Sequence, residues 1–172
     1  LNKVFIGTSY EQYADLYFSP NLSITDESIE TTSKASDAYQ KKEGSYFETL
    51  FGYAISYDKR NSVYQPSSGF VSRWSQQIPL VSDDGTIFNG YRITGYKEVT
   101  DNMILSSGIF TAAVNSLTDD DVRISKRLYA PSRRLRGFEA GKVGPKDGAD
   151  FIGGNYVFTV NTSSTIPFLL EN

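Results

Sequence analysis

The chain has 172 residues, enough for one domain with a substantial core, and its formal net charge is −3. It contains no cysteine and no histidine, which excludes disulfides, thiolate metal sites, cysteine nucleophiles, histidine-ligated zinc and a Ser-His-Asp triad. The 12 Tyr and 11 Phe stand in a chain that is 22% charged, which indicates strands with one apolar face.

Alternation of apolar and polar side chains predicts an all-β fold, an antiparallel meander of about seven strands. Pro20 lies inside the second of these strands and should weaken its pairing. We find no helix signal and no apolar run of about 18 residues that could cross a membrane as a helix. In chain order the predicted strands are 1–13, 16–24, 45–58, 70–78, 87–97, 102–113 and 154–162.

The clearest strand, 45–58, has large side chains at odd positions and small or polar ones at most even positions. A soluble sandwich would show the same alternation. The small polar-face residues and the aromatic strand ends favour a transmembrane barrel, whose apolar band is bounded by aromatic girdles. We expect Glu48, Arg73 and Arg92 to point inward. The residues expected to face lipid are Phe47, Phe51, Tyr53, Ile55, Trp74, Tyr91, Leu105, Ile109, Tyr156 and Phe158.

The connections between the predicted strands fall into two kinds. Those at 14–15, 59–69 and 98–101 are turn-like, whereas those at 25–44, 79–86 and 114–153 are mostly longer and more polar. Short turns at one side and longer loops at the other are typical of outer-membrane barrels. Because single-chain bacterial barrels close with an even strand number, an odd count predicts an incomplete segment of a larger barrel.

A glycine-rich stretch, 128–154, carries most of the functional signal. Loops longer than about 12–15 residues are usually functional or disordered, and this one has enough apolar residues to pack. Within it, Arg136 offers a planar fork suited to carboxylates, Gly137 allows a sharp turn and Phe138 could anchor the tip. The plain alternative is a surface loop with solvated arginines.

The ordered motifs of this stretch resemble the family of BamA-like outer-membrane β-barrel assembly proteins, in the superfamily that includes two-partner secretion transporters. The similarity is carried by Leu135-Arg136-Gly137-Phe138, by Gly144-Pro145-Lys146-Asp147 and by Gly153-Gly154-Asn155. The turn at 57–61, with Pro66 and Gly69, is also similar to that family. The resemblance covers nearly the whole chain and is most specific over 119–155.

The resemblance implies that residues 1–172 form one partial transmembrane domain of a barrel of about 16 strands in the Gram-negative outer membrane. A loop at about 114–153 would fold into its lumen. Leu135, Arg136, Gly137 and Phe138 would anchor that loop, and Arg136 would pair with carboxylates of the barrel wall, at least one of them beyond Asn172. Residues that would support the loop are Gly144, Pro145, Lys146, Asp147, Gly153 and Gly154.

The implied function is folding and insertion of other barrel proteins, without covalent chemistry, so the protein is not expected to be an enzyme. Implied partners are outer-membrane lipid and lipopolysaccharide, unfolded β-barrel clients, and accessory lipoproteins bound through POTRA domains that this sequence lacks. The alternatives are a two-partner secretion transporter and, from another class, a passive porin-like or adhesive barrel.

Two charged clusters have other interpretations. Carboxylates at Asp119, Asp120 and Asp121 suit a hard cation, but no calcium-loop spacing follows, so we expect a solvated loop and no metal or cofactor. The basic residues of 123–136 could suggest nucleic acid, which the net charge of −3 and the lack of a recognition helix make a poor fit. Contact with lipopolysaccharide or pairing in the lumen fits better.

Overall fold

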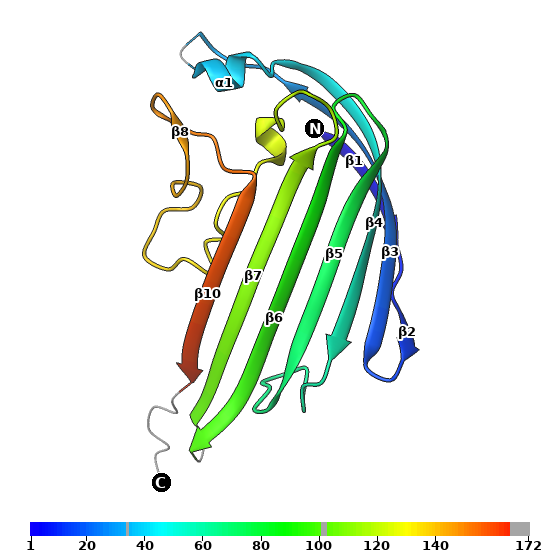
Figure 1. The fold of residues 1–172 in the computed structure, drawn as a ribbon, viewed down its shortest axis with the longest axis vertical. Coiled ribbons are helices and arrows are strands. Elements are labelled where there is room, and N and C mark those ends of the chain that lie inside the picture. The colour runs from blue at the N-terminus through cyan, green and yellow to red at the C-terminus, as the bar shows by residue number, and fades with distance from the viewer. Residues whose placement is uncertain (34, 101–102, 166–172) are drawn as a thin grey trace.

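The computed structural model describes residues 1–33, 35–100 and 103–165, and in this part of the chain eight strands form one antiparallel sheet. The sheet order is β1-β3-β4-β5-β6-β7-β10, with β2 also paired to β3 (Figure 1). The strands are β1 Asn2–Gly7, β2 Tyr10–Tyr13, β3 Leu16–Ile29, β4 Gly44–Asp58, β5 Gly69–Ser82, β6 Thr86–Thr100, β7 Met103–Ser116 and β10 Tyr156–Thr165. The all-β antiparallel prediction is confirmed.

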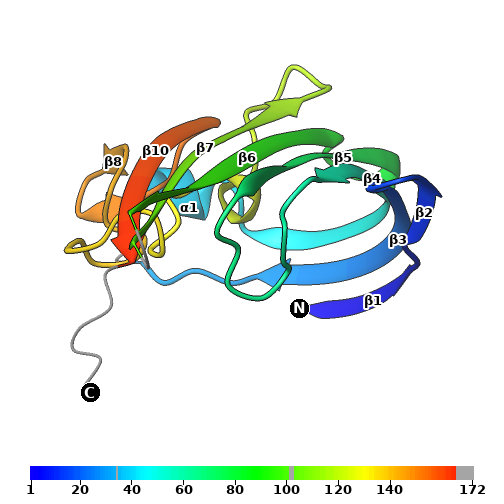
Figure 2. The ribbon, with the colours of Figure 1, turned by 90° about the horizontal axis from the view of Figure 1, so that it is seen from below.

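The sheet curves along its width into an open trough. Figure 2 shows β1 and β10 at the two edges of the trough, and these strands are not paired with each other. Strong curvature is what the right-handed twist of long paired strands produces when they approach a barrel. Two further short strands, β8 Lys146–Asp147 and β9 Asp150–Phe151, form a separate hairpin.

Several strands are longer than the sequence predicts. β3 continues to Ile29 and β5 to Ser82, so parts of the polar segments expected to be loops are paired in the sheet. Polar side chains are compatible with a strand wherever its face meets water. A prediction that ends a strand where the sequence becomes polar therefore makes such strands too short. Residues 98–100 of the predicted turn at 98–101 belong to β6, which corrects that prediction, whereas residue 101 and the predicted strand start at Asn102 lie outside the described ranges.

Two single helical turns, α1 Asp37–Gln40 and η1 Ile124–Lys126, contradict the expectation of no helix. Segments of three or four residues are too short to show a 3.6-residue period. No helix in the described part of the chain is long and apolar enough to cross a membrane.

The predicted strand 1–13 is divided into β1 and β2 at residues 8–9. This break lies opposite Pro20, whose carbonyl accepts the Thr8 N–H bond at 3.1 Å but which has no N–H of its own to donate. β3 itself continues through Pro20, which pairs with Tyr53 on its other side. The pairing of β3 is therefore interrupted at Pro20 on the side of β1 and β2 and continuous on the side of β4, so the expected weakening is found at one edge of the strand.

The connections only partly follow the predicted asymmetry. At one end, β4 and β5 are joined by residues 59–68, whereas at the opposite end β5 and β6 are joined by residues 83–85 alone. The 59–68 connection closes at Gly69, where φ is +91° and a Cβ would lie 2.0 Å from the Lys59 carbonyl oxygen. A glycine is required there because no other residue fits so close to the backbone.

Strand register separates two faces, and it confirms the predicted orientation of side chains. Cross-strand partners point to the same side, so Ile55, Trp74 and Tyr91 share the convex face. Glu48, Arg73 and Arg92 lie on the concave face. The convex face holds most of the exposed large apolar side chains, among them Phe47, Ile55, Trp74, Tyr91, Leu105, Ile109, Tyr156 and Phe158.

The convex face carries a polar cluster near the middle of β4, β5 and β6. The Tyr53 hydroxyl bonds Gln76 Oε1 at 2.8 Å, and Gln76 Nε2 donates to Asn89 Oδ1 at 2.6 Å. The three side chains satisfy one another, which lowers the cost of placing them against an apolar solvent.

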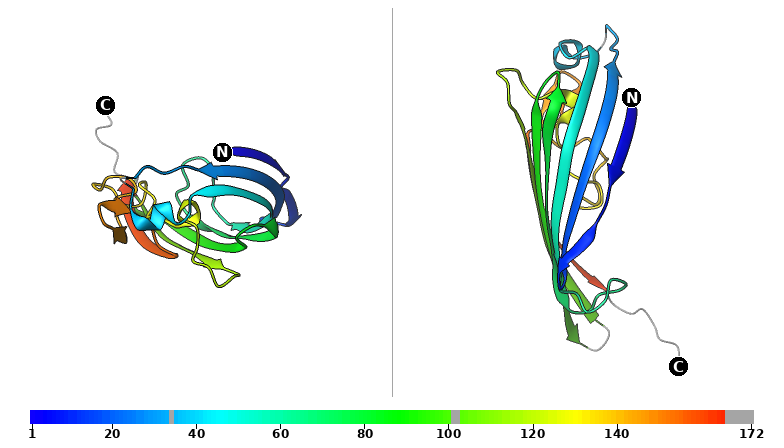
Figure 3. Two further views of the ribbon diagram at one scale, coloured as in Figure 1. Left: turned by 90° about the horizontal axis from the view of Figure 1, so that it is seen from above. Right: turned by 90° about the vertical axis from the view of Figure 1, so that its right-hand side faces the viewer.

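The buried core is small and lies on the concave face. Its buried apolar side chains are Leu50, Ala54, Ala112 and Val114 of the sheet, together with Val122 and Ile124 of the segment after β7. In views from above and from the side, that segment and α1 lie at the same end of the trough (Figure 3).

Ile109 is at the middle of β7 on the convex face, paired in register with Ile93 and Val160. We expect Ile109→Arg to lower the unfolding free energy of the full-length protein in lipid vesicles by about 2–4 kcal/mol, because a cation would face hydrocarbon. Urea denaturation followed by tryptophan fluorescence measures this. Ser106→Arg, on the concave face of the same strand, is the matched control. Equal losses in both variants would show that the convex face does not contact lipid.

Candidate functional site: the loop between β7 and β10

Residues 117–155 leave the top of β7, cross the concave face and return to the start of β10. The path is fixed at its base by an antiparallel bridge between Leu128 and Gly154, with N–H···O distances of 2.7 and 2.9 Å. The turn η1 and the β8-β9 hairpin lie along it. The loop is therefore an ordered part of the domain, as its apolar content predicts.

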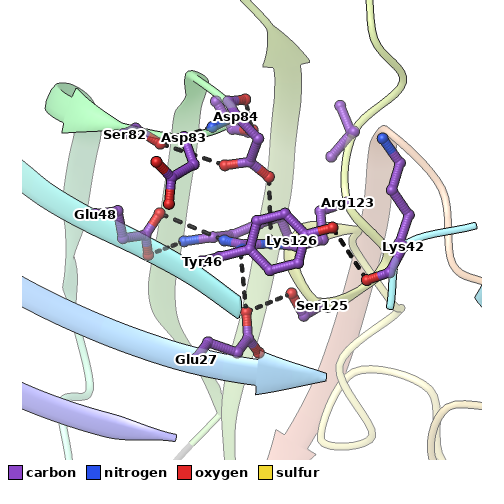
Figure 4. Close-up of polar contacts among 12 residues, drawn as sticks. Glu27, Lys42, Tyr46, Glu48, Ser82, Asp83, Asp84, Arg123, Ser125 and Lys126 are labelled. Carbon is purple, nitrogen blue, oxygen red and sulfur yellow. Dashed lines mark hydrogen bonds and ion pairs between the residues drawn. The ribbon is translucent and has the colours of Figure 1, made fainter. Parts of the chain in front are cut away.

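A buried guanidinium, that of Arg123, attaches the loop to the sheet. Only 1% of its side chain is exposed, and three carboxylates from three different elements surround it (Figure 4). The ion-pair distances are 3.2 Å to Asp84, 3.5 Å to Glu27 and 3.6 Å to Glu48. The ring of Tyr46 lies against the guanidinium, 4.1 Å from its centre, in a cation–π contact.

Two further side chains complete this network, the cation of Lys126 and the neutral hydroxyl of Ser125. Lys126 bonds the second oxygen of Glu48, and Ser125 donates to Glu27 at 2.9 Å. Glu48 is almost fully buried, with 4% of its side chain exposed. A carboxylate in such a place must be paired, because the desolvation of an unpaired charge costs several kcal/mol.

Residues on either side of Arg123 hold it in position. Arg127 pairs with Asp121 at 2.5 Å and donates from Nε to the Val122 carbonyl at 3.2 Å. Asp121 Oδ1 also accepts the N–H of Val122 at 2.8 Å. The third member of the predicted acidic cluster thus bonds within the loop. Among the described residues, no group of three or more His, Cys, Asp or Glu side chains is placed to hold a metal ion.

The structure places the predicted tip motif away from this network. Leu135 is half-buried, whereas Arg136, Gly137 and Phe138 are exposed, Phe138 at 62%. Gly137 has φ of +86°, so the expected sharp turn is present, although no atom lies within 4 Å of where its Cβ would be. Arg136 forms no ion pair with the described residues, and its pairing with a carboxylate stays a prediction.

Arg134, two residues before Arg136, is the arginine of this segment that contacts the sheet. Its guanidinium lies 4.9 Å from the centre of the Phe110 ring on the concave face. Its carbonyl oxygen accepts a hydrogen bond from the side chain of Asn161 in β10. Burial, followed by the positive charges of Arg92 and Arg133, lowers the pKa of Arg134.

The predicted supporting residues surround the β8-β9 hairpin. Pro145 accepts the N–H of Ile152 at 3.0 Å, and Lys146 lies 4.1 Å from the centre of the Phe151 ring. Gly153 has φ of +67°, and a Cβ there would meet the Leu128 carbonyl and the Tyr129 ring at 3.0 Å. Gly154 forms the bridge to Leu128, and Gly144 has φ of +137°.

Two carboxylates of this hairpin join the long loop to the loop between β3 and β4. Asp147 Oδ2 accepts the N–H of Ala38, and Asp150 Oδ2 accepts the N–H of Ser36, both at 2.9 Å. Both amides belong to the first turn of α1, where backbone N–H groups have no partner within the helix. The two loops are therefore joined through charge-assisted hydrogen bonds.

Sequence reasoning missed Arg123, Glu27, Asp84 and Tyr46 as members of one site. It singled out Glu48, and it grouped Arg123 only with the general basic run. A signal was present, because Glu27, Glu48 and Asp84 all lie at or near the ends of strands on one side of the sheet. Glu27 and Asp84 are separated by 57 positions in the sequence, and only the pairing of the strands brings them close together. The order of residues along the chain does not reveal this.

An open antiparallel sheet with an apolar convex face, a polar concave face and an inward loop defines a class of protein, the membrane β-barrel. The comparisons give the same class. The model of the Omp85 superfamily domain matches residues 3–172, so the chain belongs to the Omp85 superfamily of outer-membrane β-barrel proteins.

Among solved structures, the chain is similar to the crystal structure of BamA from Haemophilus ducreyi lacking POTRA domains 1–3. The TM-score is 0.81 at 18% identity, and the match covers 99% of this chain and 37% of that one. At this identity the likeness shows the fold, and the chain spans little more than a third of the solved protein's length. A search of the curated proteins found no match.

We expect Arg123→Ala to lower the unfolding free energy of the full-length protein by about 3–5 kcal/mol, because three buried or half-buried carboxylates lose their common partner. The loop should also become sensitive to protease. Lys142→Ala is the control, since its pair with Glu139 at 2.9 Å is exposed. Limited trypsin digestion and urea denaturation in vesicles measure both effects. Arg123→Ala with unchanged stability and protection would show that the loop is held by other contacts.

Tyr129 provides a pH-dependent test of the loop base. Its hydroxyl donates to the Phe151 carbonyl at 3.0 Å, and burial, with the neighbouring Tyr39, raises its pKa to about 12. The folded state favours the neutral phenol, so this contribution to stability is complete below about pH 10 and is lost between pH 10 and 12.

We therefore expect the absorbance titrations of the folded wild type and folded Tyr129→Phe at 295 nm to differ by one tyrosine, which titrates near pH 12 in the wild type. In denaturant the missing group should titrate near pH 10, the ordinary tyrosine value. If the two folded proteins instead differ by a tyrosine that titrates near pH 10, Tyr129 is not buried at the loop base.

Proposed function

We propose that this chain is the barrel portion of an outer-membrane assembly factor, which folds and inserts other β-barrel proteins into the outer membrane. The observation that carries the proposal is the loop between β7 and β10, which is fixed over the concave face by Arg123 and presents Leu135-Arg136-Gly137-Phe138 at its tip. Membership of the Omp85 superfamily and the fold similarity to BamA support it.

The proposed activity needs no covalent step, and we propose that the protein is not an enzyme. Assembly would depend on the barrel wall, whose convex face contacts lipid and lipopolysaccharide, and on the loop that braces the wall from inside. The clients would be unfolded β-barrel proteins. Accessory lipoproteins would bind through POTRA domains outside this sequence.

Within this proposal, Arg136 is the residue that completes the loop anchor. It is exposed in a segment where Arg134 already contacts Phe110 and Lys142 already pairs with Glu139. Its planar fork suits a carboxylate of the barrel wall outside the described residues. The pairing would hold the tip as Arg123 holds the base.

The second candidate function is that of a two-partner secretion transporter, which the superfamily match supports equally. A transporter would export a partner protein through the lumen, so its loop would have to leave the lumen or move during export. The two candidates therefore differ in what the loop must do.

We expect Arg136→Ala in the full-length protein, reconstituted in liposomes, to reduce the rate at which a client barrel becomes folded and protease-resistant. Arg136→Lys should restore only part of that rate, because lysine lacks the planar fork. Lys142→Ala, six residues away, should behave as wild type.

Two outcomes would contradict the proposal. If wild-type protein does not accelerate client insertion but does export a partner protein from loaded liposomes, the transporter is the correct function. If insertion is catalysed equally by wild type and Arg136→Ala, the protein is an insertase but Arg136 is not its loop anchor.

A further inference from the structure

A second charged region of the concave face lies apart from the Arg123 network and has the opposite balance of charge. A cavity of about 480 Å³ opens between the sheet and the loop, lined by polar and aromatic residues of β5, β6, β7 and β10. Four of the residues that line it are arginines: Arg73 and Arg92 from the sheet, and Arg133 and Arg134 from the loop. We call these four residues the arginine pocket.

The arginines converge because of strand register and loop packing. Arg73 and Arg92 are direct cross-strand partners on the concave face. Like charges in such positions repel each other and destabilise the pair. Arg134 is brought to the same place by Phe110 and Asn161, and its lowered pKa reflects burial together with the charges of Arg92 and Arg133.

No carboxylate in the described part of the chain compensates this charge. None of the ion pairs there includes Arg73, Arg92, Arg133 or Arg134, and Arg73 donates instead to the neutral Ser56 hydroxyl at 2.9 Å. Glu27, Glu48 and Asp84, the carboxylates of the Arg123 network, are paired with Arg123 and Lys126. The four cations are therefore placed together without a counter-charge from these residues.

We propose that the arginine pocket binds a phosphate-bearing ligand. Guanidinium groups bind phosphate through paired N–H···O bonds, and arginine is the usual residue for such recognition. The cavity volume is within the range of small-molecule sites, about 300–1,000 Å³, and exceeds what one protein carboxylate would fill. The phosphate group could come from a lipid of the outer membrane or from a soluble metabolite, and the same site chemistry serves both.

The test uses the full-length protein in nanodiscs of phosphatidylcholine, with inorganic pyrophosphate as the probe in isothermal titration. We expect saturable binding that weakens as salt is added, because screening reduces the attraction of charged groups. Arg92→Gln and Arg133→Gln should each weaken the affinity by about tenfold or more, since a charged hydrogen-bond donor is lost. Arg133 is in the loop and exposed, so its replacement leaves the sheet intact.

Lys97→Gln is the matched control, because it removes one positive charge from the same strand as Arg92 but on the convex face. Its affinity should equal that of the wild type. Repeating the titration in nanodiscs that contain lipopolysaccharide identifies the source of the phosphate: loss of the pyrophosphate signal indicates a lipid phosphate, and an unchanged signal indicates a soluble ligand. Absence of saturable binding, or equal binding by Arg92→Gln, Arg133→Gln and Lys97→Gln, would overturn the proposal.

Discussion

The buried pairing of Arg123 with Glu27, Glu48 and Asp84 is the interaction on which the arrangement of this domain depends. The buried apolar core on the concave face is small, which limits how much apolar packing can hold the long loop. Here the loop contributes Val122 and Ile124 to the core, and Arg123 between them joins two strands and the β5-β6 turn. Because each carboxylate comes from a different element, the network also fixes their relative positions.

The loop has a second attachment that extends this order to the surface. Asp147 and Asp150 bind the first turn of α1, so the loops after β3 and after β7 are hydrogen-bonded to each other. The base of the loop, at Leu128 and Gly154, is a short piece of antiparallel pairing. The exposed motif at 135–138 is therefore presented by a segment that is held on both sides.

The concave face has two charged regions, which lie at different positions along the strands. At the end near α1, three carboxylates meet two cations of the loop, Arg123 and Lys126, which leaves one negative charge in excess among these described residues. Nearer the middle of the sheet, Arg73 and Arg92 meet the cations of 133–134 and the charges do not balance. The first region explains how the loop is held, whereas the second has a net positive charge available to a ligand.

The sequence by itself determined the fold class, the two faces of each strand and the existence of an ordered long loop, because period-2 alternation and glycine-rich motifs are local signals. Local signals do not report how far a polar strand end stays paired, so β3 and β5 were predicted too short. Nor do they report a single helical turn such as α1.

Only the tertiary structure decided which arginine of the loop is buried. Arg123, Arg134 and Arg136 are chemically alike in sequence, yet Arg123 meets three carboxylates, Arg134 meets Phe110 and Arg136 is exposed. Which arginine is buried depends on strand register, because the register brings Glu27, Glu48 and Asp84 together from distant positions in the sequence. A buried charge is stable only where such partners converge, and convergence is a property of the folded sheet.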